Sequence, residues 1–387
     1  MSIVVFNFDT PIDRRNTGSM KWEKYKGKDI IPLWVADMDF RSPPAVIEAL
    51  HNRVEHGIFG YAVSTEELLE VILALLQKDY SWNVQPDWVV WLPGLVTGIN
   101  VSCRSVGEDQ DDVLTAVPAY PPFLTAPKYS RRNLITVDLV EDRGRWTFDF
   151  DRLERAITPR TRLFILCNPH NPVGRVFTED ELRTLTSICE KNDITICSDE
   201  IHCSLILDQD KTHVPTATLN PDVARRTITL MAASKTFNLP GLGFSFAVIP
   251  DARLRQRFQK VMAGIVPHVG VMGYAAALTA YRDSAEWHAE LIEYLRKNRD
   301  IVERTIRDIP GLSMPHVEAT YLAWIDTHTT GLKDPAKFFE DAGVGLWDSR
   351  DFGGSNAVRL NFACRRALLD KALDRMAEAM ARHVPLS

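Results

Sequence analysis

Short apolar runs alternate with amphipathic stretches through the middle of the chain. Seven runs are mostly apolar on both faces, as is typical of strands in a largely parallel sheet that helices cover on both sides. These runs are 88–92, 113–117, 134–137, 163–167, 194–198, 227–231 and 244–249. Their alternation with helical patterns predicts an α/β fold with a doubly wound, mostly parallel, seven-stranded sheet.

The helical stretches between these runs have recognisable starts. Ser64 and Glu67 are predicted to form a capping box ahead of an apolar helical stripe, and Thr178 and Glu181 are predicted to form a second one. In a sheet of this kind, ligands bind beyond the carboxyl ends of the strands. Polar residues that directly follow a strand are therefore the first candidates for chemistry.

The pattern changes near residue 285, and a chain of 387 residues exceeds what one compact core usually organises. We predict a large domain over 45–285. The irregular segment 1–44 is expected to pack on 286–387, and the two together form a smaller α+β domain. Its predicted elements are helices over 285–308, 335–341 and 366–383 and strands over 321–325 and 357–362.

Composition and charge exclude several classes of function. The net charge of −6 gives no electrostatic basis for binding nucleic acid or an anionic membrane. No apolar run reaches the roughly 18 residues that a membrane span needs, and the N-terminus lacks the features of a secretory signal. The six cysteines form no CxxC pair, so we expect buried free thiols, no metal site and a cytoplasmic location.

Two candidate residues follow strands directly. Asn171 lies in a proline-rich loop after the run 163–167, where its side chain can face a ligand, although a plain turn is the alternative. Asp199 follows the run 194–198. Its carboxylate can act as the counter-ion of a protonated ring nitrogen, or else as a helix cap or a satisfied core acid.

Two basic residues complete the set. Lys235 follows the run 227–231 among small residues, and close packing there would desolvate its amine and favour imine chemistry. A surface lysine at a strand end is the alternative. Arg359 lies within an apolar strand and needs a partner, which is either a substrate carboxylate or an internal Asp or Glu.

The order and spacing of these residues are more specific than any one of them. Asn171 and Asp199 are 28 residues apart, and Asp199 and Lys235 are 36 apart. At this point the sequence resembles the fold-type I enzymes that use pyridoxal 5′-phosphate, the aspartate aminotransferase superfamily. The resemblance implies that Asn171 contacts the ring hydroxyl, Asp199 the ring nitrogen and Lys235 the aldehyde carbon. It also implies that Arg359 binds the α-carboxylate of an amino-acid substrate.

Further motifs resemble the MalY/PatB group of cystathionine β-lyases and cysteine desulfhydrases, from about residue 5 to the end of the chain. These motifs are 34–40, 59–61, 118–123, 199–202 and 234–238. The resemblance implies a carbon–sulfur β-lyase that forms a thiol, pyruvate and ammonia, with Lys235 as the general base. An aminotransferase is the first alternative, and a non-catalytic binding or regulatory protein on the same fold is the second.

The resemblance also assigns roles to residues that the pattern alone leaves unexplained. Tyr61 would reach the phosphate of the neighbouring subunit, which makes a homodimer the working unit and places Tyr61 with Lys235 and Asp199 among the catalytic residues. The other implied roles are ring stacking by Tyr120, phosphate binding by the backbone of Gly94, Leu95 and Val96 and by Ser234, a cofactor contact by His202 and substrate binding by Ala36.

The sequence departs from the family pattern at two positions. Ser204 stands where the group often has an acid, and Gly243 stands where many aminotransferases place an Arg that binds the phosphate. The second departure argues against an ordinary aminotransferase. A nicotinamide-dependent dehydrogenase is also discounted, because no GxGxxG motif follows the first strand.

Overall fold

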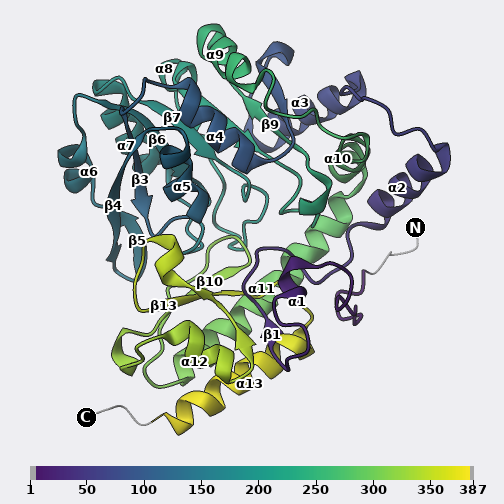
Figure 1. Ribbon diagram of the computed structural model, residues 1–387, viewed down its shortest axis with the longest axis vertical. Helices are drawn as coiled ribbons and strands as arrows, with labels where there is room; N and C mark the ends of the chain where they lie inside the picture. Colours follow the sequence, from purple (N-terminus) through teal and green to yellow (C-terminus); the bar gives the residue numbers. More distant parts are fainter. Residues whose placement is uncertain (1–5, 384–387) are drawn as a thin grey trace.

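The computed structural model describes residues 6–383, and its centre is one large sheet with helices on both sides (Figure 1). The sheet has eight strands in the order β2-β9-β8-β7-β6-β3-β4-β5. The strands are β2 (Val89–Leu92), β3 (Asp112–Val117), β4 (Asn133–Asp142), β5 (Arg145–Phe148), β6 (Thr161–Cys167), β7 (Thr195–Asp199), β8 (Thr227–Met231) and β9 (Ser245–Val248).

All seven predicted runs are strands, and the mostly parallel α/β prediction is confirmed. The pairs that join β4, β3, β6, β7 and β8 are parallel, whereas β9 runs antiparallel to both of its neighbours. The eighth strand, β5, was not predicted. It forms a hairpin with β4 through Arg143 and Gly144, whose φ angles of 52° and 76° suit a two-residue turn. Its short, half-exposed sequence lacks the doubly apolar pattern of a central strand.

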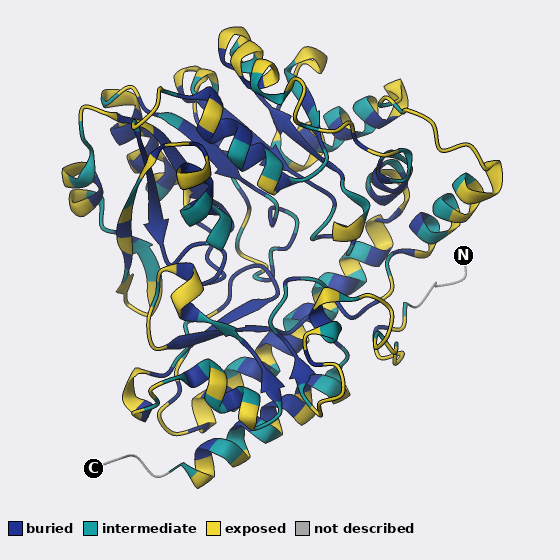
Figure 2. Cartoon of the chain, in the orientation of Figure 1, coloured by how far each residue is buried: buried dark blue, intermediate teal, exposed yellow. Residues whose placement is uncertain are grey.

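The two faces of the sheet carry separate apolar cores, because successive residues of a strand point to opposite sides. Val113 packs with residues of α4, α5 and α9, whereas its neighbour Leu114 packs with residues of α6 and α7. Buried strands thus lie between helices whose outer sides are exposed (Figure 2). These helices are α4 (Leu95–Ser105), α5 (Pro121–Tyr129), α6 (Phe150–Ala156), α7 (Glu179–Lys191), α8 (Pro221–Arg225) and α9 (Ala252–Met262).

One predicted helix start is confirmed and the other is wrong. Helix α7 begins with the predicted capping box of Thr178 and Glu181. Helix α3 (Glu66–Tyr80) instead begins after Thr65, whose Oγ1 accepts from the Leu68 amide at 3.2 Å. Ser64 does not cap it, because its hydroxyl donates to the Thr65 carbonyl at 3.1 Å.

The C-terminal part contains a second, three-stranded sheet in the order β10-β13-β12. The predicted elements of this part are present to within one residue at each end. The segment before residue 44 packs here, since β1 pairs in parallel with β11. The elements of this part are α1 (Met20–Glu23), β1 (Ile31–Pro32), α11 (Ala285–Asp308), β10 (Leu322–Asp326), α12 (Pro335–Asp341), β11 (Val344–Gly345), β12 (Trp347–Asp348), β13 (Ala357–Asn361) and α13 (Arg366–Arg382). Helices α2 (Pro44–His56) and α10 (Val271–Asp283) pack against each other.

The core of this part extends beyond the predicted boundary at residue 285. It joins Phe8 and Leu33 to residues of α11 and α13, and it also includes Leu205 and Phe237. The limits of the two domains therefore stay a prediction. All six cysteines are buried free thiols, as predicted. Within residues 6–383, no helix is both long enough and apolar enough to cross a membrane.

A buried ion-pair network connects the loop that carries Asn171 to the C-terminal part. The Glu318 carboxylate accepts from Arg175 Nη1 at 3.1 Å and from the Val176 amide at 2.8 Å. Arg145 Nε donates to the same carboxylate at 3.0 Å. Both Glu318 and Arg175 are buried, so neither can exchange its partner for water.

We expect Glu318→Ala to lower the free energy of unfolding by about 3 kcal/mol, because it leaves a buried guanidinium without one of its carboxylates. Denaturant unfolding of the purified protein measures the change. Glu154→Ala is the matched control, since Glu154 pairs with Lys191 at the surface and its loss should cost less than about 1 kcal/mol. Equal effects of the two substitutions would contradict the prediction.

Candidate functional site

Lys235 lies in the loop after β8 and its amine faces the backbone of residue 36. Its Nζ donates to the Ala36 carbonyl oxygen at 2.6 Å. Burial lowers the pKa of the amine to about 8. The negative charges of Asp37 and Asp199 raise this pKa, and the positive charge of Arg359 lowers it further. About a tenth of Lys235 is therefore neutral and nucleophilic at pH 7, far more than of an ordinary lysine.

Asp199 is the last residue of β7, beside β8 in the sheet. Burial raises the pKa of its carboxyl to about 7, although the Ile201 amide donates to Oδ1 at 3.1 Å and the nearby charge of Lys235 favours the anion. Among the described residues it has no salt-bridge partner within 4 Å, and no helix follows that it would cap. The carboxylate is thus poised to take up a cationic partner.

Arg359, on β13, is fully buried and lies against Asn171. Its Nη1 donates to Asn171 Oδ1 at 2.8 Å, and its Nη2 donates to the Trp34 carbonyl at 2.9 Å. The guanidinium packs against the rings of Trp347 and Phe352, with its Cζ 4.5 and 4.8 Å from the ring centroids. In the described chain it pairs with no Asp or Glu, and its Nε has no partner. An internal carboxylate therefore does not account for this arginine.

His202 and Tyr120 line the same region. His202 is buried, its Nδ1 has no hydrogen-bond partner, and burial lowers the pKa of its ring to about 3, so the imidazole is neutral. Tyr120 directly precedes α5, and burial raises the pKa of its hydroxyl. The charge of Arg359 lowers this pKa and that of Asp199 raises it, but burial is the larger effect.

Helix α4 begins close to this region with free backbone N–H groups. Gly94 is its N-cap, no side chain caps it, and Leu95 and Val96 form its first turn. Such a helix start binds anions well. Gly243 lies against the same turn: its φ is +61° and an added Cβ would meet the Pro93 carbonyl at 3.2 Å. An arginine at position 243 would therefore be strained. Ser234 immediately precedes Lys235 in the loop after β8.

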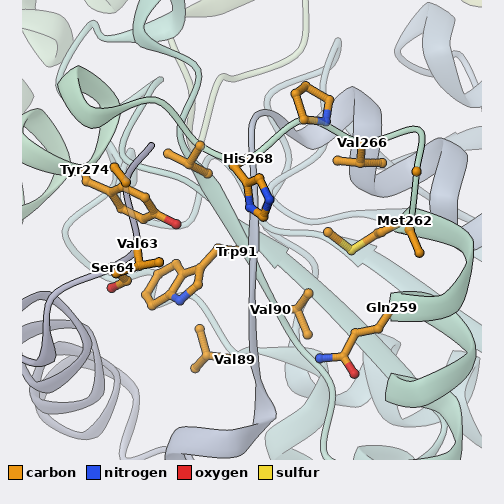
Figure 3. A pocket seen from close by; sticks show the side chains of 15 residues that line it. Val63, Ser64, Val89, Val90, Trp91, Gln259, Met262, Val266, His268 and Tyr274 are labelled. Carbon is orange, nitrogen blue, oxygen red and sulfur yellow. The ribbon is translucent and has the colours of Figure 1, made fainter. Parts of the chain in front are cut away.

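Tyr61 is not brought into this cluster. Its side chain is fully exposed, in a segment with three other exposed apolar side chains, those of Ile58, Phe59 and Val63. Directly beside this segment lies a cavity of about 490 Å³, in which Val63 and Ser64 lie near Trp91 and Tyr274 (Figure 3).

The backbone of residues 34–38 is held by side chains from several parts of the chain. Each of its five carbonyls accepts a hydrogen bond from a side chain. The donors are Arg359 to Trp34, Asn361 to Val35 and Asp37, Lys235 and Tyr321 to Ala36, Lys21 to Asp37, and Arg14 and Asn238 to Met38. The only sequence signal was the motif 34–40, which did not point to Tyr321 or Asn361.

The donor set fits the cofactor that the resemblance implies. The start of α4 suits a phosphate, Asp199 suits a basic ring nitrogen, and the amine of Lys235 suits an aldehyde carbon. The unpartnered nitrogens of His202 and Arg359 are polar atoms that a bound molecule can satisfy.

Comparisons with known proteins agree with this geometry. Residues 28–376 match the model of the aminotransferase class I and II family. The chain is 35% identical to cystathionine beta-lyase PatB of Bacillus subtilis, over 97% of this chain and all of that protein. The structure of OvoB is 45% identical with a TM-score of 0.96, covering 98% of this chain and 100% of OvoB. Cystalysin from Treponema denticola, whose structure contains pyridoxal 5′-phosphate, is 32% identical with a TM-score of 0.94, covering 98% of this chain and 99% of cystalysin. The chain therefore belongs to the class I and II aminotransferase family.

Proposed function

We propose that the protein is a pyridoxal 5′-phosphate-dependent carbon–sulfur β-lyase. It cleaves cystathionine, cysteine or a related sulfur amino acid by α,β-elimination to a thiol, pyruvate and ammonia. The observation that carries the proposal is the partly desolvated amine of Lys235, placed among the charges of Asp199, Asp37 and Arg359. The full-length similarity to a protein named cystathionine beta-lyase supports the lyase activity.

When bound, the cofactor supplies an electrophilic carbon and a sink for the electrons of the broken Cα–H bond. Lys235 would hold the cofactor through its amine, and the same amine, when free and neutral, would take the α-proton of the substrate. Asp199, as an anion, would favour a protonated ring nitrogen.

Arg359 binds the α-carboxylate and so orients the Cα–H bond toward the base. Asn171 holds Nη1 of this arginine and the Trp347 ring packs against it, which leaves the position of the guanidinium fixed before substrate binds. Ala36 lies at the same place, since its carbonyl accepts from Lys235. Substrate thus meets a preorganised site.

The experiment that tests the lyase is an assay for pyruvate from L-cystathionine or L-cysteine without any keto acid. An aminotransferase, which the family name keeps as the second candidate, uses the same residues up to proton abstraction. Pyruvate release without a keto acid is expected. Turnover only after a keto acid is added would show an aminotransferase instead, and a protein that takes up no cofactor would exclude both.

We propose a homodimer in which Tyr61 contributes to the phosphate site of the partner subunit. The exposed side chains of Ile58, Phe59, Tyr61 and Val63 form an apolar segment that a second copy would cover. The phosphate would bind at Gly94, Leu95, Val96 and Ser234, with Tyr120 against the ring and His202 beside it. A reducing compartment such as the cytoplasm suits the six free thiols.

We expect Arg359→Ala to raise KM for L-cystathionine roughly 100-fold with a smaller change in kcat, because the substrate carboxylate loses its charged partner. Steady-state kinetics of pyruvate formation measure both constants. Arg350→Ala is the control, since Arg350 is exposed and pairs with Asp334 and Asp348 near the same sheet. A KM that changes less than about twofold in Arg359→Ala would remove this residue from substrate binding.

A further inference from the structure

Tyr321 shares an acceptor with the lysine of the site. It directly precedes β10 and is almost completely buried. Its hydroxyl donates to the Ala36 carbonyl at 3.0 Å, and Lys235 Nζ donates to the same oxygen at 2.6 Å. The residue belongs to no motif of the sequence, and the proposed function gives it no role.

The position of the Tyr321 ring is fixed from several directions. The backbone carbonyl of Tyr321 accepts from the Phe362 amide at 3.0 Å, and this bond connects Tyr321 to the end of β13. The ring meets that of His202 edge to face, with centroids 6.2 Å apart. Burial and the charge of Asp37 raise the pKa of its hydroxyl, so the group stays protonated and remains a donor. Tyr321 can therefore hold the Ala36 carbonyl in one orientation.

The orientation of that carbonyl determines where the lone pair of the amine points. A neutral amine that donates one N–H to Ala36 cannot direct its lone pair to the same side. The carbonyl oxygen has two lone pairs, and the Tyr321 hydroxyl occupies one of them. Less acceptor capacity then remains for a charged ammonium at Lys235, which favours the neutral amine.

On the basis of the proposed function, we infer that Tyr321 is a positioning residue that fixes the Ala36 carbonyl and, through it, the amine of Lys235. The amine also faces Asp37, Asp199 and Arg359, whose charges the substitution of Tyr321 leaves in place. Removal of the hydroxyl should thus change how readily Lys235 gives up its proton, while the ring and its packing stay.

The test uses Tyr321→Phe and measures Lys235 directly in cofactor-free protein. Cyanate carbamoylates only the neutral amine, so the pH dependence of this reaction at Lys235, followed by peptide mass spectrometry, gives the pKa of the amine. We expect the midpoint of Tyr321→Phe to lie about half a pH unit or more above that of the wild type, the shift that one hydrogen bond can produce. In the cofactor-loaded enzyme, kcat should fall about tenfold with KM changed less than twofold, and the acid limb of kcat should move in the same direction.

Tyr25→Phe is the matched control, because Tyr25 is a buried tyrosine whose hydroxyl donates to Glu340 outside the site. It should leave the midpoint and kcat unchanged. A Tyr321→Phe midpoint equal to that of the wild type, in protein with an unchanged melting temperature, would overturn the inference and leave the lyase proposal intact. A wild-type Lys235 that titrates like an ordinary exposed lysine, in protein that binds no pyridoxal 5′-phosphate, would overturn both.

Discussion

Lys235→Ala should lower the rate of pyruvate formation from L-cystathionine more than about 10⁴-fold. The substitution removes two functions at once, because the same amine holds the cofactor and then takes the α-proton, and proton transfer by a positioned base alone contributes about 10² to 10⁴. The hydrogen-bond partner of Nζ is the Ala36 carbonyl oxygen, which cannot take over the proton near neutral pH.

Three measurements separate this loss from misfolding. The variant should bind pyridoxal 5′-phosphate without the visible absorption band of the lysine adduct, and its melting temperature should remain near that of the wild type. Added methylamine, a small primary amine that lacks the rest of the lysine side chain, should restore part of the rate. Lys260→Ala is the control, since Lys260 is exposed on α9 and should be fully active. Activity within tenfold of the wild type in Lys235→Ala would exclude this lysine as the base.

Much of the fold follows from local patterns that the sequence makes visible. The run 163–167 is apolar on both faces because β6 lies between β3 and β7 with helices on both sides. This pattern predicts the strand from its own five residues, without knowledge of the residues that pack against it. The hairpin strand β5 was missed because it lies at an edge, where only one face is covered. The cap of α3 was assigned to Ser64 instead of Thr65, since both side chains can cap a helix and only the loop before it decides between them.

The site could be predicted only as far as each residue carries its own signal. Lys235 and Asp199 stand out because a charged residue at the end of an apolar strand has few ordinary explanations. The bond between Arg359 and Asn171 joins residues 188 positions apart, and no local pattern encodes it. The sequence predicts Tyr321 only as the first residue of a strand. Its contact with the site has no local signal, because its hydroxyl donates to the backbone carbonyl of Ala36, 285 residues away.

We expect Asp199→Asn to lower kcat about 10³-fold with little change in KM. An amide cannot carry the negative charge that holds a proton on the ring nitrogen, and without that proton the ring accepts fewer electrons from the broken Cα–H bond. The neighbouring carboxylate of Glu200 does not substitute for it, because it is already bonded to Ser198, Thr216 and His213. Steady-state kinetics and the deuterium isotope effect on the α-proton measure the change. A near-wild-type kcat would remove the argument from the ring nitrogen.

The same variant should also change how stability depends on pH in the cofactor-free protein. The folded-state pKa of Asp199 is about 7, above the ordinary value of 3.8, so the folded state holds this proton more tightly than the unfolded chain. Its contribution is fully present below about pH 4 and is lost as the pH rises through about 7. The amide that replaces the carboxyl group does not titrate. Asp199→Asn should therefore gain stability relative to the wild type between these limits, by at most about 4 kcal/mol. Denaturant unfolding at both pH values, with the exposed Asp308→Asn as control, measures this gain. If the free energies of unfolding of the variant and the wild type differ by the same amount at both pH values, Asp199 is ionised in the folded protein even without a cationic partner. Binding of that partner would then release no proton from Asp199.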